Sequence, residues 1–521
     1  MIHSTPLWII ALLWLLIAAP LQAQNKAIPL TRWHTQDIDR AVIRDSIIVH
    51  TGSKPLITQN LHGLGVRSLF NDSTKVYLPL TNYLYRKHAV ELKHDDVWIA
   101  IDPLMNLAYW QDQADQTPYA DTTWFFQNTR GIQLQGTLGA RFGFVTGFYE
   151  NQGQWPEFMR RQAEANGVAP GMGRWKRYRF HGFDYSMSYA QMHYSFKRWL
   201  TLRAGQGKHF VGHGYRSLLL SDAAFNYPYL SAELTSPNGK WQYTTRYFAL
   251  QTLERMPLGE VPEALFKRKA MTMHYLSWSP HPKLELGLFE GIVWNRFGST
   301  GTHMPSWGAY VPVLGINTAA LGWDNANNVI AGLNARVSPR SDLKIYGQWV
   351  VDGVEESQMG WQAGVQWFDA IPHLDIQLEY NHSGSLLYTH PQGFESYSHF
   401  NQSLGSPVLP GSDEVVGIIE YRYRRWIARS QYNRIASTAR AGSAWYTSDY
   451  ATETAMQDQL IQQVDNSIGI RVNVKYNLEV LLHWLWREQR TELQGANNTF
   501  LKSQIFGMSI RTNLHNLYND F

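Results

Sequence analysis

The residues that could do chemistry gather in one glycine-rich segment, GQGKHFVGHGYRSLLLSDAAFNYPYL, at 205–230. Its glycines do not have the G-x-G-x-x-G spacing of a dinucleotide loop, the P-loop pattern is absent, and no helical pattern follows. His209 and His213 are spaced like two metal ligands on one helical face, but the segment follows a strand pattern and no third ligand is indicated. We therefore expect no metal site and no other cofactor.

A polar network in the interior of the fold explains these side chains better. The basic and acidic side chains of the segment can pair there, and the glycines allow close backbone packing where a side chain would clash. Such a network also suits contact with an acidic glycan. The predicted members, which include two residues of a later strand, are Arg203, Lys208, His209, Tyr215, Arg216, Asp222, Glu290 and Trp294.

The elements that must position these residues show a period of two from about Gly131 onward. In HLDIQLEYNHS, residues 373–383, Leu374 and every second residue to Tyr380 are apolar, while the residues between them are polar. SDLKIYGQWVVDG, residues 341–353, repeats this alternation. A period of two predicts strands with one apolar and one polar face. Roughly 16 to 19 such segments follow residue 97.

Tight turns join many of these segments in pairs. Asn477 alone separates the alternating segments SIGIRVNVKY and LEVLLHWLWRE, and short turns are also predicted around Arg198, His281 and Arg340. Connections of this length require antiparallel neighbours.

Three connections, at 149–182, 293–325 and 434–466, are far longer than the ~12–15 residues beyond which a loop is usually functional or disordered. They are rich in Trp, Tyr and Asn. Aromatic faces beside amide groups are suited to holding sugars. The alternative is that these loops fold back and close a pore.

The apolar faces favour a membrane barrel over a soluble sandwich. Aromatic residues make up 14% of the chain and charged residues 17%, below the ~25% of an average soluble protein. Indole rings recur near strand ends, at Trp294, Trp349, Trp367, Trp426, Trp484 and Trp486. Aromatic girdles on ~10-residue strands are typical of barrels that cross the outer membrane, where closure leaves no unpaired backbone in lipid. We predict an all-β, transmembrane antiparallel β-barrel of about eighteen strands.

The N-terminal residues predict export. Leu7–Ala19 form an apolar run, shorter than a spanning helix, and Ala23 precedes Gln24, so residues 1–23 are predicted to be a signal peptide. Residues 24–127 are predicted to form a plug or periplasmic region that can include the first strand, and residues 128–521 the outer-membrane barrel. Phe521 suits the terminal strand that the barrel-insertion machinery binds.

Composition excludes several other classes of protein. The formal charge of +4 is small for 521 residues, so we expect no nucleic-acid partner. The absence of cysteine excludes disulfides and thiolate chemistry. No G-x-S-x-G or H-E-x-x-H motif is present, and adjacent carboxylates such as Glu355 and Glu356 do not by themselves make a glycosidase. We expect that the protein is not an enzyme.

The segment GHGYRSLLLSDAAFNYPYL resembles the hallmark segment of the Wzi-type capsule-assembly family, in which a glycine-rich turn leads into an S-L-x-L-S run. MHYLSWSPHPKLELGLFEGIVW, residues 273–294, resembles a strand pair of that family. VHTGSKPL, residues 49–56, is similar to a segment of its Bacteroidetes branch, which includes a gliding-motility surface protein. The resemblance implies an outer-membrane barrel of about eighteen strands with a helical N-terminal plug, which acts as a surface lectin for capsular polysaccharide.

The expected function is therefore to bind or organise capsular or exopolysaccharide at the cell surface, with outer-membrane lipid and surface polysaccharide as partners. A barrel of this width can also hold a water channel, so a porin or a polysaccharide export pore is the first alternative. An accessory role in gliding motility or secretion is the second.

Overall fold

The computed structural model describes residues 25–61, 63–64, 79–115, 117, 119, 124–256, 266–298, 301–323, 327–440, 444–452, 455–493 and 498–521. The predicted signal peptide, residues 1–23, lies outside these described residues. Within the described ranges, no helix is both long and apolar enough to cross a bilayer.

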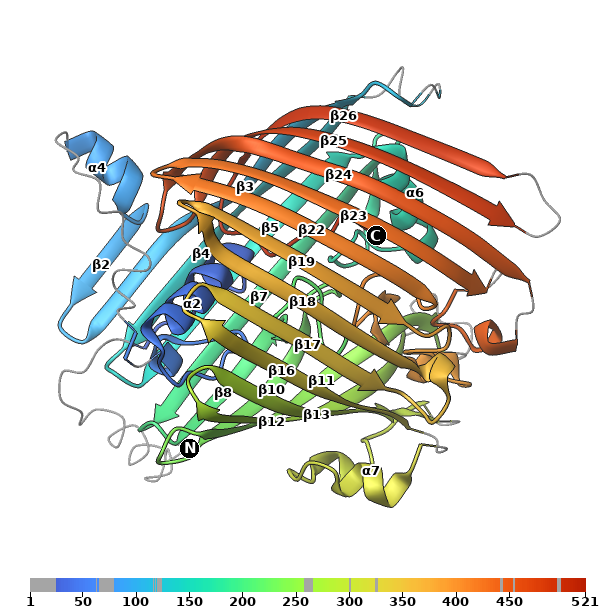
Figure 1. Cartoon of the computed structure of the whole chain (residues 1–521), viewed down its shortest axis with the longest axis horizontal. Helices are drawn as coiled ribbons and strands as arrows, with labels where there is room; N and C mark the ends of the chain where they lie inside the picture. The colour runs from blue at the N-terminus through green and yellow to red at the C-terminus, as the bar shows by residue number, and fades with distance from the viewer. Residues whose placement is uncertain are drawn as a thin grey trace, which may run out of the picture.

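The chain forms a closed antiparallel β-barrel of 18 strands, which confirms the predicted fold class (Figure 1). Pairing of the last strand with the first closes the ring. In order around the barrel the strands are β3 (Val97–Asp112), β4 (Phe125–Leu138), β5 (Phe142–Gln154), β7 (Gly182–Phe196), β8 (Leu200–Gly207), β10 (Tyr227–Thr235), β11 (Trp241–Arg255), β12 (Phe266–His281), β13 (Leu284–Asn295), β16 (Asn328–Arg340), β17 (Leu343–Val351), β18 (Met359–Ile371), β19 (Leu374–Ser383), β22 (Ser412–Tyr423), β23 (Trp426–Arg440), β24 (Met456–Asn473), β25 (Leu478–Leu493) and β26 (Thr499–Arg511).

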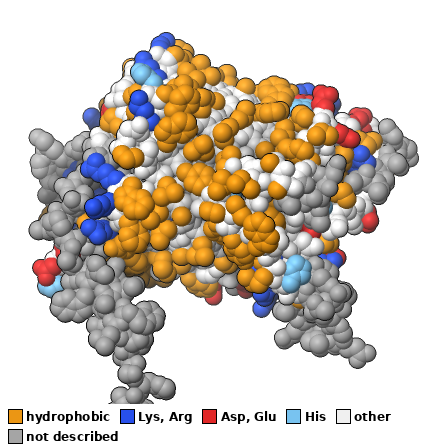
Figure 2. Space-filling model, turned by 90° about the horizontal axis from the view of Figure 1, so that it is seen from below, with side chains coloured by type: hydrophobic (Ala, Val, Ile, Leu, Met, Phe, Trp, Pro, Cys, Tyr) orange, Lys and Arg blue, Asp and Glu red, His pale blue; other side chains and the backbone are white. Residues whose placement is uncertain are grey.

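Alternation of side chains fixes which face of each strand points outward. On β17, Ile345 and Trp349 are exposed on the outside, while Lys344 and Gln348 are buried in the lumen. A shift of one residue in register would place these charged and polar groups on the apolar exterior, so the alternation specifies the register. Figure 2 shows apolar side chains covering much of one outer face. A closed barrel with this exterior is a protein of the outer membrane.

The connections differ in length at the two ends of the barrel. At one end, here called the turn end, neighbouring strands are joined by short turns at 139–141, 197–199, 236–240, 282–283, 341–342, 372–373, 424–425 and 474–477. Long connections lie at the other end, the loop end. Outer-membrane barrels keep short turns in the periplasm, so the loop end faces outward from the cell.

The predicted hairpin around Asn477 is present between β24 and β25. β24 ends at Asn473, however, so Val474 and Tyr476 belong to the turn and not to the predicted strand. Asn477 has a positive φ of 45°, a backbone conformation that closes the turn and that Asn tolerates well.

The N-terminal segment 25–61 lies inside the barrel near the turn end (Figure 1). It comprises α2 (Arg32–Asp45), β1 (Ser53–Lys54) and η1 (Thr58–Leu61). Its apolar side chains pack on one another, with Ile38, Val42 and Leu61 among the members of the cluster. The region 24–127, predicted to be a plug that can include the first strand, contains both this segment and the first barrel strand, β3.

Several smaller elements complete the chain. β2 (Val90–His94) pairs with β3, β6 (Lys176–Tyr178) pairs with β7, and α4 (Pro79–Arg86) lies beside β2 at the turn end (Figure 1). α6 (Glu157–Asn166) follows β5. Three short strand pairs are separate from the barrel wall: β1 with the distant β9 (Phe210–Val211), and the hairpins of β14 (Phe297–Gly298) with β15 (Gly301–Thr302) and of β20 (Ser398–His399) with β21 (Gln402–Ser403). The remaining helices are η2 (Trp307–Tyr310), α7 (Ile316–Leu321), η3 (Glu356–Gln358), η4 (Gly393–Glu395) and η5 (Ser448–Thr452).

The C-terminal residues 512–521, the tail, turn back into the lumen. β26 ends at Arg511, and Arg487 on β25 donates a hydrogen bond to the backbone oxygen of Phe521. The prediction that Phe521 belongs to the terminal strand is therefore wrong. The sequence HNLYNDF lacks the alternation of a strand, and its polar side chains find buried partners inside the barrel.

Candidate functional site

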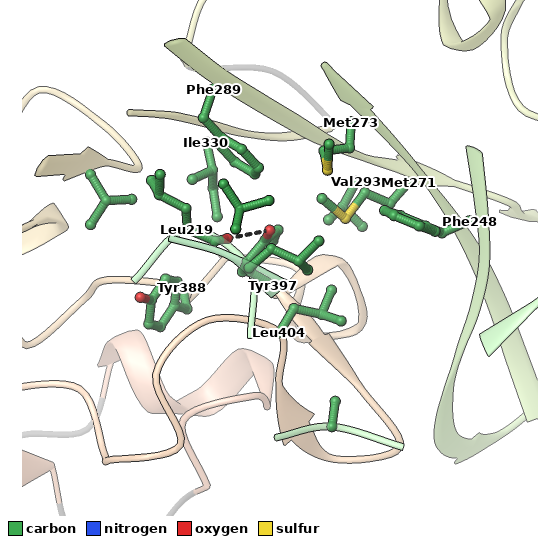
Figure 3. Packing of buried hydrophobic residues seen from close by; sticks show 14 of the residues in the cluster. Leu219, Phe248, Met271, Met273, Phe289, Val293, Ile330, Tyr388, Tyr397 and Leu404 are labelled. Atoms are coloured by element: carbon green, nitrogen blue, oxygen red, sulfur yellow. Dashed lines mark hydrogen bonds between the residues drawn. The ribbon is translucent and has the colours of Figure 1, made fainter. Parts of the chain in front are cut away.

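The glycine-rich segment, residues 205–230, enters the lumen after β8 and forms an apolar core there. Leu218, Leu219 and Leu220 are fully buried among side chains of the barrel wall and of the connection 384–411 (Figure 3). The hydroxyl groups of Tyr388 and Tyr397 donate hydrogen bonds to the carbonyl oxygens of Leu218 and Leu219, both at 2.7 Å. The S-L-L-L-S run therefore joins a long loop-end connection to the wall.

Two glycines of the segment allow the backbone to approach the wall. A Cβ atom on Gly214 would lie 2.5 Å from a carboxylate oxygen of Glu379, and one on Gly212 would lie 2.5 Å from the amide nitrogen of Gln348. Because Gly214 has no side chain, the backbone lies close enough for Glu379 to accept hydrogen bonds from the N–H groups of Tyr215 (2.6 Å) and Arg216 (3.0 Å). The predicted role of these glycines in close packing is confirmed at both positions.

Arg216 is the centre of a buried ionic network. Its guanidinium donates to Glu414 on β22 at 2.7 and 3.1 Å, and to the Asp520 carboxylate at 3.1 Å and carbonyl at 2.8 Å. Tyr215 donates to the second Asp520 oxygen at 2.7 Å. Burial alone would lower the pKa of Arg216, but Asp520 and Glu414 together raise it well above its ordinary value, so the group stays charged.

Asp222 and Lys208 extend this network. Asp222 accepts hydrogen bonds from Asn516 (2.8 Å) and Tyr518 (2.7 Å) of the tail. The Lys208 ammonium donates to the carbonyls of Asp222 and of Gly171, in the connection after α6. Burial lowers the pKa of Lys208 to about 8. The predicted residues Lys208, Tyr215, Arg216 and Asp222 are thus brought together, and all are buried or nearly so.

Arg203 and His209 lie in separate surroundings. Arg203 pairs with Glu233 at 3.0 Å and donates to the carbonyl of Pro55, so it holds the N-terminal segment. The His209 ring packs against Tyr229 and Phe248, and burial lowers its pKa well below the ordinary value. No group of three or more metal-ligating carboxylate or imidazole side chains occurs among the described residues.

Glu290 and Trp294 are not part of the lumenal network, contrary to the predicted grouping. On β13 they share the parity of Leu286 and Leu288, whose side chains are exposed outside the barrel, whereas Glu285 and Phe289 point inward. Both residues are buried because the connection after β13 folds back over the outer wall. Trp294 therefore has the outward direction expected of a girdle residue.

The described residues line a lumenal cavity of about 320 Å³ between the tail, α2, α6 and the strands β3, β4, β7 and β22 to β26. It is lined by aromatic, amide and charged side chains. The lining includes Trp33, Trp110, Trp155, Asn106, Gln127, Asn516, Arg32, Arg429, Arg511, Glu420, Asp465 and Glu479. Glu479 and His483 lie on the polar face of the alternating segment LEVLLHWLWRE, so the alternation predicts their inward direction. The contributions of α2 and the tail were missed, because neither follows a strand pattern.

A second group of polar residues lies at the loop end, on the hairpin formed by β6 and the start of β7. Residues 174–181, the surface hairpin, contain Arg174, Lys176, Arg177 and Arg179, and no acidic residue occurs between Glu164 and Asp184. Phe180 at its tip is 86% exposed, and Trp124 on the neighbouring connection is 70% exposed. The sequence analysis identified the long connection that contains this hairpin, but it made no prediction from the four cationic residues.

Comparisons with known proteins bear on the fold. No protein-family model and no curated protein matches the chain. Among solved structures, Wzi, an outer-membrane protein involved in group 1 capsule assembly in Escherichia coli, matches with a TM-score of 0.56 and 14% identity over 94% of this chain and 100% of that chain. OccAB2 of Acinetobacter baumannii matches with a TM-score of 0.41 and 11% identity over 79% and 97%. OprD of Pseudomonas aeruginosa matches with a TM-score of 0.39 and 12% identity over 80% and 96%.

Proposed function

We propose, from the outer-membrane barrel fold that this chain shares with Wzi, that the protein binds polysaccharide at the cell surface through its loop end. Wzi is described as a carbohydrate-binding β-barrel. The observation that carries the proposal for this chain is the surface hairpin, with four cationic side chains and an exposed Phe180 close together.

The chemistry of the hairpin selects the class of glycan. Four cations lie on the exposed hairpin, and the nearest carboxylate in its register is the single Asp184 opposite Lys176. This excess of cations creates a positive potential that attracts anionic polymers. An exposed aromatic face offers a sugar ring an apolar surface to stack on. The ligand that fits both features is an acidic polysaccharide, whose carboxylate or other anionic groups meet the cations while its rings contact Phe180 and Trp124.

Contacts inside the lumen support an anchoring role. The N-terminal segment, the glycine-rich segment, the connection 384–411 and the tail all pack within the barrel. The network around Arg216, which is 1% exposed, is closed by protein partners and cannot reach a polymer outside the barrel. Among the described residues, this filling supports a fixed loop end and favours an anchor over a passage for a polymer.

The test is to replace Arg174, Lys176, Arg177 and Arg179 together by Gln and to measure binding of purified protein to alginate, an acidic polymer, and to dextran, a neutral one. Wild-type protein is expected to bind alginate in a salt-sensitive manner, and the variant to lose about tenfold or more in affinity, because the charges that attract the polymer are removed.

The matched control variant makes the same change of charge at the turn end. Replacing Lys197, Arg198, Lys240 and Lys283 by Gln removes the same number of cations from the opposite rim. This variant is expected to bind alginate like wild type. Equal loss of binding in both variants, or no binding of any acidic polymer by wild type, would overturn the proposal. Binding to cell-surface polysaccharide of the native host then identifies the ligand.

The charged cavity of about 320 Å³ favours a second candidate function, passage of a small solute or of a glycan strand. Its charges alternate in sign, with arginine and carboxylate side chains facing the same space. Conductance separates this candidate from the anchor, because a porin passes ions steadily. The gliding or secretion role and the Bacteroidetes branch stay predictions of the sequence resemblance.

A further inference from the structure

The connection after β13 covers part of the outer wall of the barrel. Residues 301–323, here called the strap, contain η2 and α7, and α7 lies outside the ring of strands (Figure 1). The strap lies over outward-facing side chains of β11, β12, β13 and β16, among them Thr272, Ile292 and Val329. A wall that elsewhere exposes apolar side chains to the membrane is here covered by the chain itself.

The strap is fastened by hydrogen bonds to the outward face of the wall. Thr272 donates to the carbonyl of Ala309 at 2.6 Å, and Tyr243 donates to that of Pro312 at 2.9 Å. The Glu290 carboxylate accepts from the backbone N–H groups of Gly315 (3.0 Å) and Thr318 (3.2 Å), and from the Thr318 hydroxyl. The Trp294 indole packs in the same cluster as Ala309.

Glu290 makes this covering necessary. It is the seventh of the twelve residues of β13, level with His274 on β12, so both side chains lie about half-way along the barrel wall. Facing lipid, a carboxylate or imidazole at that height would lose its hydrogen bonds, at a cost of several kcal/mol for each group. Under the strap, Glu290 is 2% exposed and its oxygens are hydrogen-bonded.

The far side of the strap is apolar. Trp307 is 82% exposed, and Met304, Tyr310, Val313 and Ile316 are also exposed. These side chains continue the belt of outward apolar residues on the neighbouring strands, such as Leu288 and Leu333. The strap begins at the loop end and covers the wall as far as Glu290. It therefore lies at the height of the outer leaflet.

We propose that the strap is immersed in the outer leaflet, with Trp307 and Ile316 in contact with lipid chains and Glu290 as its fastening point. The molecules that contact the exposed face of the strap are the lipids that surround the belt of outward apolar residues. The strap widens the lipid-facing surface on one side of the barrel and shields the polar wall beneath it. This inference is independent of the proposed polysaccharide binding.

The chain has no cysteine, so single cysteines can be introduced and labelled cleanly. Trp307→Cys and Ile316→Cys carry a nitroxide spin label in full-length protein inserted into vesicles of phosphatidylethanolamine and phosphatidylglycerol. Collision with oxygen, which concentrates in lipid, is compared with collision with a water-soluble nickel complex. Leu230→Cys, on the outer face of β10, is the lipid reference, and Val354→Cys, exposed in a loop-end connection, is the water reference.

Both strap labels are expected to match Leu230→Cys, with an oxygen-to-nickel ratio severalfold above that of Val354→Cys. A ratio like that of Val354→Cys would place the strap in water and overturn the proposal. Low collision with both agents would mean that protein, such as a second copy, covers the strap, which also overturns it. Adding Glu290→Ala to Trp307→Cys is expected to increase the mobility of the label, whereas Glu355→Ala, in an exposed loop, leaves it unchanged.

Discussion

At the scale of single residues, the buried charges of the lumen hold distant parts of the chain together. Arg216 meets Asp520, a residue 304 positions away in sequence. The sequence predicted that Lys208, Arg216 and Asp222 join a polar network in the interior, because charged groups can pair there and avoid lipid. Their partners in the tail could not be predicted, because no local pattern links segments so far apart.

Replacing Arg216 by Ala removes the guanidinium that contacts both Glu414 and Asp520 and leaves these two carboxylates buried. Breaking a buried pair in this way costs about 3–5 kcal/mol, so we expect a lower temperature of unfolding and release of the tail. Protease cleavage within residues 512–521, followed by mass spectrometry, detects the release. Arg340→Ala removes an exposed arginine that pairs with Asp342 at the turn end and should cost about 1 kcal/mol or less. A tail that stays protected in Arg216→Ala would contradict this role.

Glu290 shows where reasoning from the sequence failed at this scale. Alternation along β13 assigns Leu286, Leu288 and Glu290 to one face, and that face is apolar and outward. A carboxylate on a lipid-facing wall contradicts the rule for barrels, so the sequence favoured the lumen for it. The strap resolves the contradiction, because it supplies hydrogen-bond donors outside the wall.

At the scale of elements, the barrel wall clamps α2 with ion pairs. Lys344 on β17 pairs with Asp39 at 2.7 Å, and Arg422 on β22 pairs with Asp37 at 2.7 Å. The wall residues follow the alternation of their strands, so their inward direction was predictable. The helix itself was expected from the family resemblance, because its mixed sequence gave no clear period.

Replacing Asp37 and Asp39 together by Asn should loosen α2 inside the lumen. Lys344 would lose the carboxylate that it contacts in a buried site, at a cost of about 3–5 kcal/mol. We expect faster hydrogen exchange of the amides in residues 32–45, measured by mass spectrometry on the inserted protein. Asp45→Asn, at the exposed end of the same helix, is the control and should leave exchange unchanged. Unchanged exchange in the double variant would mean that these two ion pairs do not hold the helix.

At the scale of the whole molecule, the sequence predicted the wall of the barrel better than its contents. Strand alternation, tight turns and aromatic belts each repeat around the ring, so many weak local signals agree. The lumen is filled by pieces that share no period: the N-terminal segment, the S-L-L-L-S run, the connection 384–411 and the tail. Only their packing against the inward faces identifies them as the filling of a barrel wide enough to hold a channel.

We propose that this filled barrel serves as an anchor, and the conductance of single molecules in planar bilayers tests this role most directly. Full-length protein is compared with a variant that lacks residues 25–61 and 512–521 but retains every barrel strand. We predict no steady conductance for the full-length protein and clear ion flow through the variant. Steady conductance steps from the full-length protein would contradict the claim and favour a porin or an export pore.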